Sequence, residues 1–141
     1  MTDVFEFSDE LGPAKILVIH EPRVPLKAIL VVDNVAAGPA IGGARMALDV
    51  SLAECFRLAR AMTLKNAAAG LPLGGCKSVI FSDTAMPAPD KERTISAFAL
   101  AISLFTDYIV GPDIGTNEED MYWIVDEIGR GLGLPAEIGG I

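Results

Sequence analysis

The second half of the sequence alternates helical and β-strand patterns, and this alternation limits the possible folds more than any other feature. From residue 51 onward, segments with apolar residues at helical spacing are separated by short runs of β-branched and aromatic residues. Such alternation is typical of domains in which helices cover both faces of a mostly parallel sheet. We therefore predict an α/β fold, a three-layer sandwich with a largely parallel sheet.

Helices are predicted where apolar stripes lie between starting and stopping signals. Two of them begin at capping boxes, in which a side-chain oxygen and a carboxylate each satisfy a free backbone amide, and glycine is a natural stop. The predicted helices are Ser51 to Gly70, about Asp90 to Asp107, and Thr116 to Gly129.

Strands are predicted where short β-branched and aromatic runs lie between turn residues. A proline-containing loop separates the first two runs, so we expect these strands to pair as neighbours. Segment 34–49 is rich in Gly, Ala and Pro and has no sustained period, so we predict an ordered loop that crosses the domain. The predicted strands are Ala14–His20, Lys27–Asp33, Ser78–Ser82 and Tyr108–Val110.

Length and composition narrow the class of protein. A chain of 141 residues is long enough for one domain with a real core. Its net charge of -8 does not suit a polyphosphate backbone, so we expect no nucleic-acid partner. No apolar run approaches the roughly 20 residues that span a bilayer, so we expect no membrane partner. The hydrophobic content of 51% fits a surface covered by another subunit or domain.

The cysteines and the histidine exclude several kinds of site. Cys55 and Cys76 fit neither a metal-binding spacing nor a disulfide framework, and the N-terminus lacks a signal-peptide pattern, so a cytoplasmic location is expected. His20 is the only histidine. It cannot build a multi-histidine metal site or a Ser-His-Asp triad within this chain, and we interpret it as structural.

Two lysines could carry chemistry. Lys65 follows Met62 by three residues on the first predicted helix, which places it near the apolar side. Lys77 follows small residues that would leave room for a ligand. A lysine in a partly desolvated pocket beside another cation can act as a base near neutral pH. The alternative, in which both amines extend to water, stays open.

Asp113 follows a predicted strand and precedes a predicted helix. Its carboxylate is expected at the carboxyl edge of the sheet, where open α/β folds bind ligands, although a turn role in Gly-Pro-Asp is the alternative. A phosphate-binding loop is not predicted. Segment 70–78 has one residue too many between Gly75 and Lys77 and leads into a strand, and segment 129–133 does not match G-x-G-x-x-G.

Four motifs resemble, in order and spacing, the signatures of the Glu/Leu/Phe/Val dehydrogenase family. They are Gly38–Met46, Met62–Ala67, Leu71–Lys77 and Pro112–Thr116. The resemblance implies that residues 1–141 form the substrate-binding and dimerisation domain of an enzyme that reversibly deaminates an L-amino acid to a 2-oxo acid and ammonia. It also implies catalytic roles, with Lys77 as the base that activates water and Asp113 as the carrier of protons to and from the amino group.

The resemblance implies substrate contacts as well. Lys65 would bind the α-carboxylate beside a Gly42-Gly43 turn, and further contacts would come from Ile41, Met62 and Thr116. Ile41 stands where the glutamate-specific branch has a lysine that pairs with the distal carboxylate, so an apolar amino acid is expected. Arg45 could replace that lysine, which keeps glutamate open. Cys76 stands where the family has Gly, Ala or Ser and adds an oxidisable sulfur beside Lys77.

The coenzyme and the partners are implied in the same way. NAD or NADP would be bound by a C-terminal Rossmann domain absent from this chain, so the chain alone is expected to bind no coenzyme and to be inactive. A homo-oligomer, dimer or higher, is expected. The alternative is a non-catalytic amino-acid-binding or assembly module derived from the family.

Overall fold

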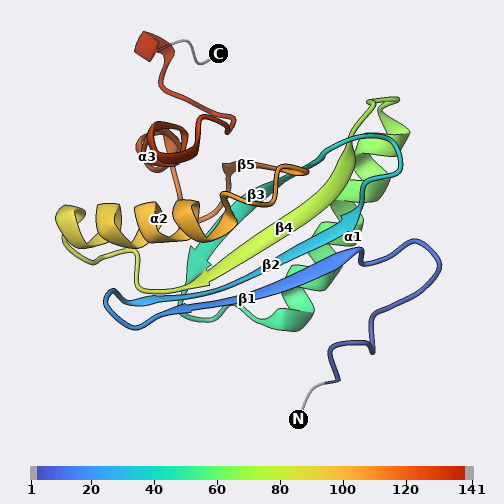
Figure 1. Cartoon of the computed structure of the whole chain (residues 1–141), viewed down its shortest axis with the longest axis horizontal. Helices are drawn as coiled ribbons and strands as arrows, with labels where there is room; N and C mark the ends of the chain where they lie inside the picture. Colours follow the sequence, from blue (N-terminus) through green and yellow to red (C-terminus); the bar gives the residue numbers. More distant parts are fainter. Residues whose placement is uncertain (1–2, 139–141) are drawn as a thin grey trace.

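A computed structural model describes residues 3–138, in which helices cover both faces of a five-stranded sheet (Figure 1). The strands are β1 (Lys15–Glu21), β2 (Leu26–Asn34), β3 (Ala40–Ala47), β4 (Gly74–Phe81) and β5 (Tyr108–Pro112). The helices are α1 (Leu52–Ala68), α2 (Ala88–Ile102), α3 (Glu118–Ile128) and the short 3-10 helix η1 (Ala136–Ile138). No helix among these residues is long and apolar enough to cross a membrane.

The strand order is β1-β2-β4-β3-β5, and four of the five strands point the same way. β3 pairs in parallel with both β4 and β5, whereas β2 pairs antiparallel with both β1 and β4. β2 is therefore the one reversed strand among the described residues, and β1 again runs with β4. The predicted α/β class with a largely parallel sheet is confirmed, as is the pairing of the first two strands.

The core lies in two layers, one on each face of the sheet. Side chains alternate between faces along a strand. Val31 and Val79 pack against Phe56 of α1 on one face, which we call the α1 face. On the other face, buried residues of the sheet pack against α2 and α3, which contribute Phe98 and Met121 to this layer. Figure 1 shows α1 on one side of the sheet and α2 and α3 on the other, which completes the predicted three layers.

The prediction of a loop across segment 34–49 is wrong for residues 40–47, which form β3 in the middle of the sheet. Ala40, Gly42 and Ala44 are buried in alternation, but such small side chains give little hydrophobic periodicity. Close packing requires Gly42 to be small. A Cβ on Gly42 would lie 1.8 Å from the carbonyl oxygen of Cys76.

The glycine-rich segment before Lys77 is part of β4, which begins at Gly74 and not at Ser78. A Cβ on Gly74 would lie 1.8 Å from the carbonyl oxygen of Asn34, and one on Gly75 would lie 2.0 Å from the amide nitrogen of Thr63. The protein's own backbone therefore occupies the space beside these glycines. The expectation that they leave room for a ligand is wrong.

At the starts of α1 and α3, the capping side chains differ in part from those predicted. The box at α3 is formed by Asn117 and Asp120, one residue later than predicted, with each side chain accepting from the other's amide at 3.1 and 2.9 Å. At α1, Ser51 Oγ accepts from the Glu54 amide at 3.1 Å as predicted. The Glu54 carboxylate does not complete the box because it binds Arg45.

Candidate functional site

Part of the α1 face is only partly covered. α1 packs mainly against β4 and β2. On β3, Ile41, Gly43 and Arg45 project to the α1 face and are half-buried, whereas the residues between them project to the other face and are buried. We call the region of the α1 face over β3 and β5 the open face.

Lys77 and Asp113 form an ion pair beside the open face. Lys77 projects from β4 to the α1 face and is 6% exposed. Asp113 directly follows β5, as predicted, and its Oδ2 accepts a hydrogen bond from Lys77 Nζ. The last pair between β3 and β5 is Ala44 with Pro112, and from the next residue the Asp113 side chain extends across β3 to Lys77 on β4. The structure thus brings together the two residues that were predicted to be catalytic.

Backbone contacts fix the position of Asp113. Its Oδ1 accepts from the Ile114 amide at 2.7 Å, and its own amide donates to Thr116 Oγ1 at 2.9 Å. The Thr116 hydroxyl donates to the Ala44 carbonyl oxygen at 2.8 Å, which ties this turn to β3. Gly43 leaves the space that the aspartate occupies, because a Cβ there would lie 2.7 Å from Asp113 Cβ.

Arg45 adds a second cation to the pair. Its Nη1 binds Glu54 Oε1 at the start of α1, and its Nη2 lies 3.5 Å from Asp113 Oδ1. The sequence pointed to Arg45 only as a possible replacement for a substrate-binding lysine, and it gave Glu54 no role beyond the helix cap. The alternation of side chains along β3 places Arg45 on the same face as Ile41. This alternation could have pointed to Arg45 only if the strand itself had been predicted.

Burial and charge act on the amine of Lys77. Burial lowers the pKa of Lys77, and the positive charge of Arg45 lowers it further. The Asp113 carboxylate opposes this change because it stabilises the ammonium at hydrogen-bond distance. The prediction that Lys65 is the neighbouring cation that favours the neutral amine is wrong, because in the structure that cation is Arg45.

Lys65 and Met62 lie on the last turns of α1. Met62 is half-buried, but Lys65 is exposed, so the expectation that Lys65 lies near the apolar side is wrong. No hydrogen bond or ion pair within residues 3–138 joins Lys65 to Lys77 or Asp113. Ile41 lies beside Gly75 of β4 and Ile109 of β5, at the amino-terminal part of the open face.

Cys76 is on the opposite face of the sheet from the Lys77 amine, since consecutive strand residues alternate. It has no exposed surface, and burial raises its pKa well above the ordinary range for a thiol. The expectation of an oxidisable sulfur beside the base is therefore wrong.

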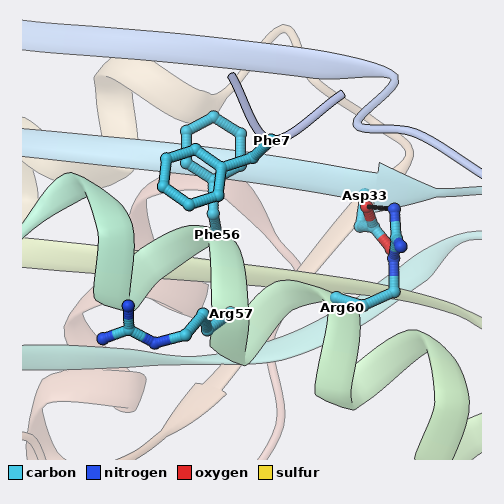
Figure 2. A pocket seen from close by; sticks show the side chains of 5 residues that line it. All are labelled: Phe7, Asp33, Phe56, Arg57 and Arg60. Carbon is cyan, nitrogen blue, oxygen red and sulfur yellow. Dashed lines mark hydrogen bonds and ion pairs between the residues drawn. The ribbon is translucent and has the colours of Figure 1, made fainter. Parts of the chain in front are cut away.

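Figure 2 shows a hollow in another part of the chain, between the N-terminal segment and α1, with a volume of about 250 Å³. Phe7 stacks on Phe56 with ring centroids 4.6 Å apart, and Arg60 binds Asp33. Arg57 extends away from that pair (Figure 2). None of the predicted site residues lines this hollow. Its contacts attach the N-terminal segment to α1.

The described residues thus form an α/β domain that holds a desolvated lysine against an aspartate on a partly open sheet face. Comparison with known proteins defines the family. Residues 20–130 match the model of the Glu/Leu/Phe/Val dehydrogenase dimerisation domain, and the chain belongs to this family.

The similar proteins are amino-acid dehydrogenases. The chain is 36% identical to phenylalanine dehydrogenase from Thermoactinomyces intermedius, with 99% of this chain and 39% of that protein covered. It is 38% identical to leucine dehydrogenase from Geobacillus stearothermophilus, with 97% and 38% covered. The chain thus spans about two fifths of the length of these relatives.

Solved structures show the same fold. Glutamate dehydrogenase from Peptoniphilus asaccharolyticus superimposes with a TM-score of 0.86 at 29% identity, covering 97% of this chain and 39% of that one. A leucine-bound, hetero-hexameric glutamate dehydrogenase from Thermus thermophilus superimposes with a TM-score of 0.85 at 29% identity, covering 92% and 36%.

Proposed function

We propose that this chain is the substrate-binding and self-associating domain of an NAD(P)-dependent L-amino-acid dehydrogenase, which reversibly deaminates its substrate to a 2-oxo acid and ammonia. The observation that carries the proposal is the buried Lys77–Asp113 pair beside the open face, in a chain that belongs to this family. A non-catalytic amino-acid-binding or assembly module is the alternative, and an activity assay separates the two.

Lys77 and Asp113 can divide the proton transfers of such a reaction. We assign Lys77 as the base that takes a proton from water as the water attacks the imino carbon, because burial and Arg45 both favour its neutral form. Asp113 would pass protons to and from the amino group. The hydrogen bond between Nζ and Oδ2 gives a direct path for a proton between the two groups.

The remaining site residues are assigned to substrate binding and positioning. Lys65 is exposed on the last turn of α1, so its ammonium can pair with an α-carboxylate that enters from solvent. Met62 precedes it on the same helix. Gly42 and Gly43 bring the β3 backbone alongside the substrate, and Thr116 acts through the turn that holds Asp113.

Ile41 and Arg45 support a preference for an apolar amino acid. Ile41 offers a half-buried apolar surface on the open face. Arg45 is already bound to Glu54 and lies beside Asp113, so its charge is not available to a distal carboxylate. Burying a second carboxylate without a cation costs several kcal/mol, whereas an aliphatic side chain gains about 25 cal/mol for each Å² removed from water.

The coenzyme is assigned to a separate domain because the strand-to-helix turns at α2 and α3 do not suit a pyrophosphate. The first turn of α3 carries Glu118, Glu119 and Asp120, whose charges oppose an anion at the positive end of the helix. The start of α2 has no side-chain cap and has a proline in its first turn, which removes an amide donor. Calorimetric titration with NAD should give no saturable heat, and micromolar binding would contradict this assignment.

The function can be tested by fusing the chain to the nucleotide-binding domain of a leucine dehydrogenase and assaying oxidative deamination. We expect a higher kcat/KM for leucine or phenylalanine than for glutamate. Lys77→Met and Asp113→Asn should each lower kcat by at least about 100-fold. Ile41→Lys should raise relative activity toward glutamate. An inactive fusion whose substrates still bind would favour the non-catalytic module.

A further inference from the structure

We propose that Arg45 is a positioning residue of this site, which holds the Asp113 carboxylate in place and keeps the Lys77 amine ready to accept a proton. The inference rests on the proposed function and gives Arg45 a positioning role on Asp113, in addition to its effect on the charge of Lys77. Arg45 would not touch the substrate or the reacting atoms. It would act through Lys77 and Asp113.

The geometry of the guanidinium supports this role. Its two Nη atoms face carboxylates from different elements, Glu54 at the start of α1 and Asp113 after β5. Glu54 would complete a capping box at α1 if it turned back toward Ser51, but its carboxylate binds Arg45 instead. The start of α1 therefore has the Ser51 cap alone, and the Glu54 carboxylate anchors Arg45 instead. That anchor fixes the side from which Arg45 approaches Asp113.

The position of Arg45 on the sheet leads to the same role. Arg45 of β3 lies opposite Val79 of β4. Val79 is two residues after Lys77 and projects to the same face, so Arg45 and Lys77 are diagonal neighbours on the α1 face. Its side chain is 22% exposed, and those of Lys77 and Asp113 are 8% and 16% exposed. Charges this far removed from water interact strongly. Arg45 and Lys77 thus share the Asp113 carboxylate, while Arg45 also binds Glu54.

The charged surroundings of Lys77 identify Arg45 as the group that opposes its protonation. Asp113 and Glu54 are carboxylates and favour the ammonium form. Cys55 of α1 and Cys76 of β4 are buried thiols that remain neutral. Arg45 on β3 is the cation that lowers the pKa of Lys77 in the described part of the chain. Only burial lowers this pKa more than Arg45 does.

A purely structural ion pair would predict a different result. If Arg45 only linked β3 to α1, its removal would lower stability and leave the titration of Lys77 unchanged. If Arg45 shares the Asp113 carboxylate with Lys77 and opposes protonation, its removal lets Lys77 hold its proton to higher pH. The titration midpoint of Lys77 therefore separates the two roles.

The experiment follows the Lys77 side chain by NMR in lysine-labelled protein across a pH series, with Lys77→Arg to assign its signal. We expect Arg45→Gln to move the Lys77 midpoint to higher pH, and Arg45→Lys to move it less because a cation is retained. The matched control is Arg57→Gln, which removes one exposed arginine from α1 and should leave the midpoint unchanged. An unchanged midpoint in Arg45→Gln, or an equal shift in the control, would overturn the proposal.

A second pair of variants guards against a failure to fold, because Arg45→Gln leaves two carboxylates without their arginine. Asp113→Asn removes one of them. Comparing it with Arg45→Gln/Asp113→Asn measures the effect of Arg45 in a background with less uncompensated charge, and the double variant should again have the higher Lys77 midpoint. Equal midpoints in the two proteins would overturn the proposal.

Activity of the fusion protein separates this inference from the proposed function. In an active fusion, Arg45→Gln should shift the acidic limb of the kcat/KM profile to higher pH and lower kcat about tenfold near neutral pH, with a smaller change in KM. An unshifted limb would contradict the positioning role. A wild-type fusion without activity would count against the proposed function alone, because the titration of Lys77 needs no catalysis.

Discussion

At the scale of single residues, the site depends on a glycine that makes space for a charged side chain. Gly43 lies directly across from Gly111 on β5, but only Gly43 faces Asp113 at close range. A Cβ on Gly43 would lie 2.7 Å from Asp113 Cβ and 2.9 Å from the carbonyl oxygen of Pro112. A Cβ on Gly111 would meet Leu132 at an ordinary 3.8 Å.

Gly43→Ala should therefore be more harmful than Gly111→Ala. We expect Gly43→Ala to lower the free energy of unfolding by about 1–3 kcal/mol, because the added methyl group overpacks the site and displaces Asp113. Urea unfolding of both variants measures the effect. If Gly111→Ala costs as much as Gly43→Ala, the contact with Asp113 is not what requires glycine.

Burial of a thiol gives the chain a predictable loss of stability at alkaline pH. Burial raises the pKa of Cys55 to about 12, whereas a free thiol titrates near 8.5. The folded chain holds this proton more tightly than the unfolded chain. The stability that depends on it is therefore complete below about pH 8.5 and is lost as the pH rises toward 12.

Between pH 8 and pH 10, Cys55 should account for a loss of about 2 kcal/mol in the free energy of unfolding. Urea unfolding of the wild type and of Cys55→Ala at both pH values measures it. The variant should lose less stability over this interval, although Cys76 and Tyr108, whose pKa values burial also raises, keep part of the slope. Equal losses in both proteins would contradict the burial of the Cys55 thiol.

At the scale of elements, Arg130 closes the end of α2. Its guanidinium donates to carbonyl oxygens of the segment that runs from the end of α2 to the start of β5, those of Ile102 at 2.8 Å, Ser103 at 3.3 Å, Phe105 at 3.0 Å and Tyr108 at 3.2 Å. α2 has no basic residue in its own last turn. α2 ends at Ile102, before the predicted Asp107, and Arg130, which follows α3 in the sequence, contacts the segment after that end.

Arg130→Met should lower the free energy of unfolding by about 3 kcal/mol, because buried carbonyl groups lose a charged donor. Arg93→Met is the matched control. Arg93 is 67% exposed and pairs with Asp90 within α2, so its replacement should change stability by no more than about 0.5 kcal/mol. Thermal or urea unfolding decides the comparison, and similar effects of the two substitutions would contradict a capping role for Arg130.

The elements also show what the sequence could predict. Long apolar stripes and large β-branched side chains identify α1, α2 and the first two strands, because their burial is visible in hydropathy. β3 was missed because Ala40, Gly42 and Ala44 are small, Gly42 for a steric reason that involves a neighbouring strand. Because β3 was not predicted, the alternation of side chains that places Arg45 beside Asp113 was not recognised either. Lys77 and Asp113 could be identified because their motifs are local, whereas the partners of Arg45 lie on other elements.

At the scale of the whole molecule, apolar side chains remain exposed on the sheet edge and on α2. β1 is an edge strand, and Val18 on it is 71% exposed. Leu100 and Leu104, in and just after α2, are 58% and 88% exposed. A groove beside β1 is lined by Ile19, Leu26 and Leu100 among others. An exposed edge strand offers unpaired backbone groups to another chain, and large exposed apolar patches mark interaction sites.

We predict that the chain self-associates through this surface. Sedimentation of the wild type should show a dimer or larger species at tens of micromolar, roughly where a specific interface should hold. Leu100→Glu should shift the population toward monomer. Leu64→Glu changes an equally apolar exposed residue on α1 and should not. A wild-type monomer, or equal effects of the two substitutions, would contradict the assignment.

The central claim is that the open face beside Lys77 and Asp113 binds an amino acid or its 2-oxo acid. NMR titration of the labelled chain with 4-methyl-2-oxopentanoate, and with 2-oxoglutarate for comparison, tests it most directly. We predict saturable shifts of the Gly42, Gly43 and Lys77 amides, with the branched oxo acid binding more tightly and Lys65→Met weakening both. Saturable shifts centred instead on Phe7 and Phe56, or no saturable shift near Lys77 at millimolar ligand, would contradict the account.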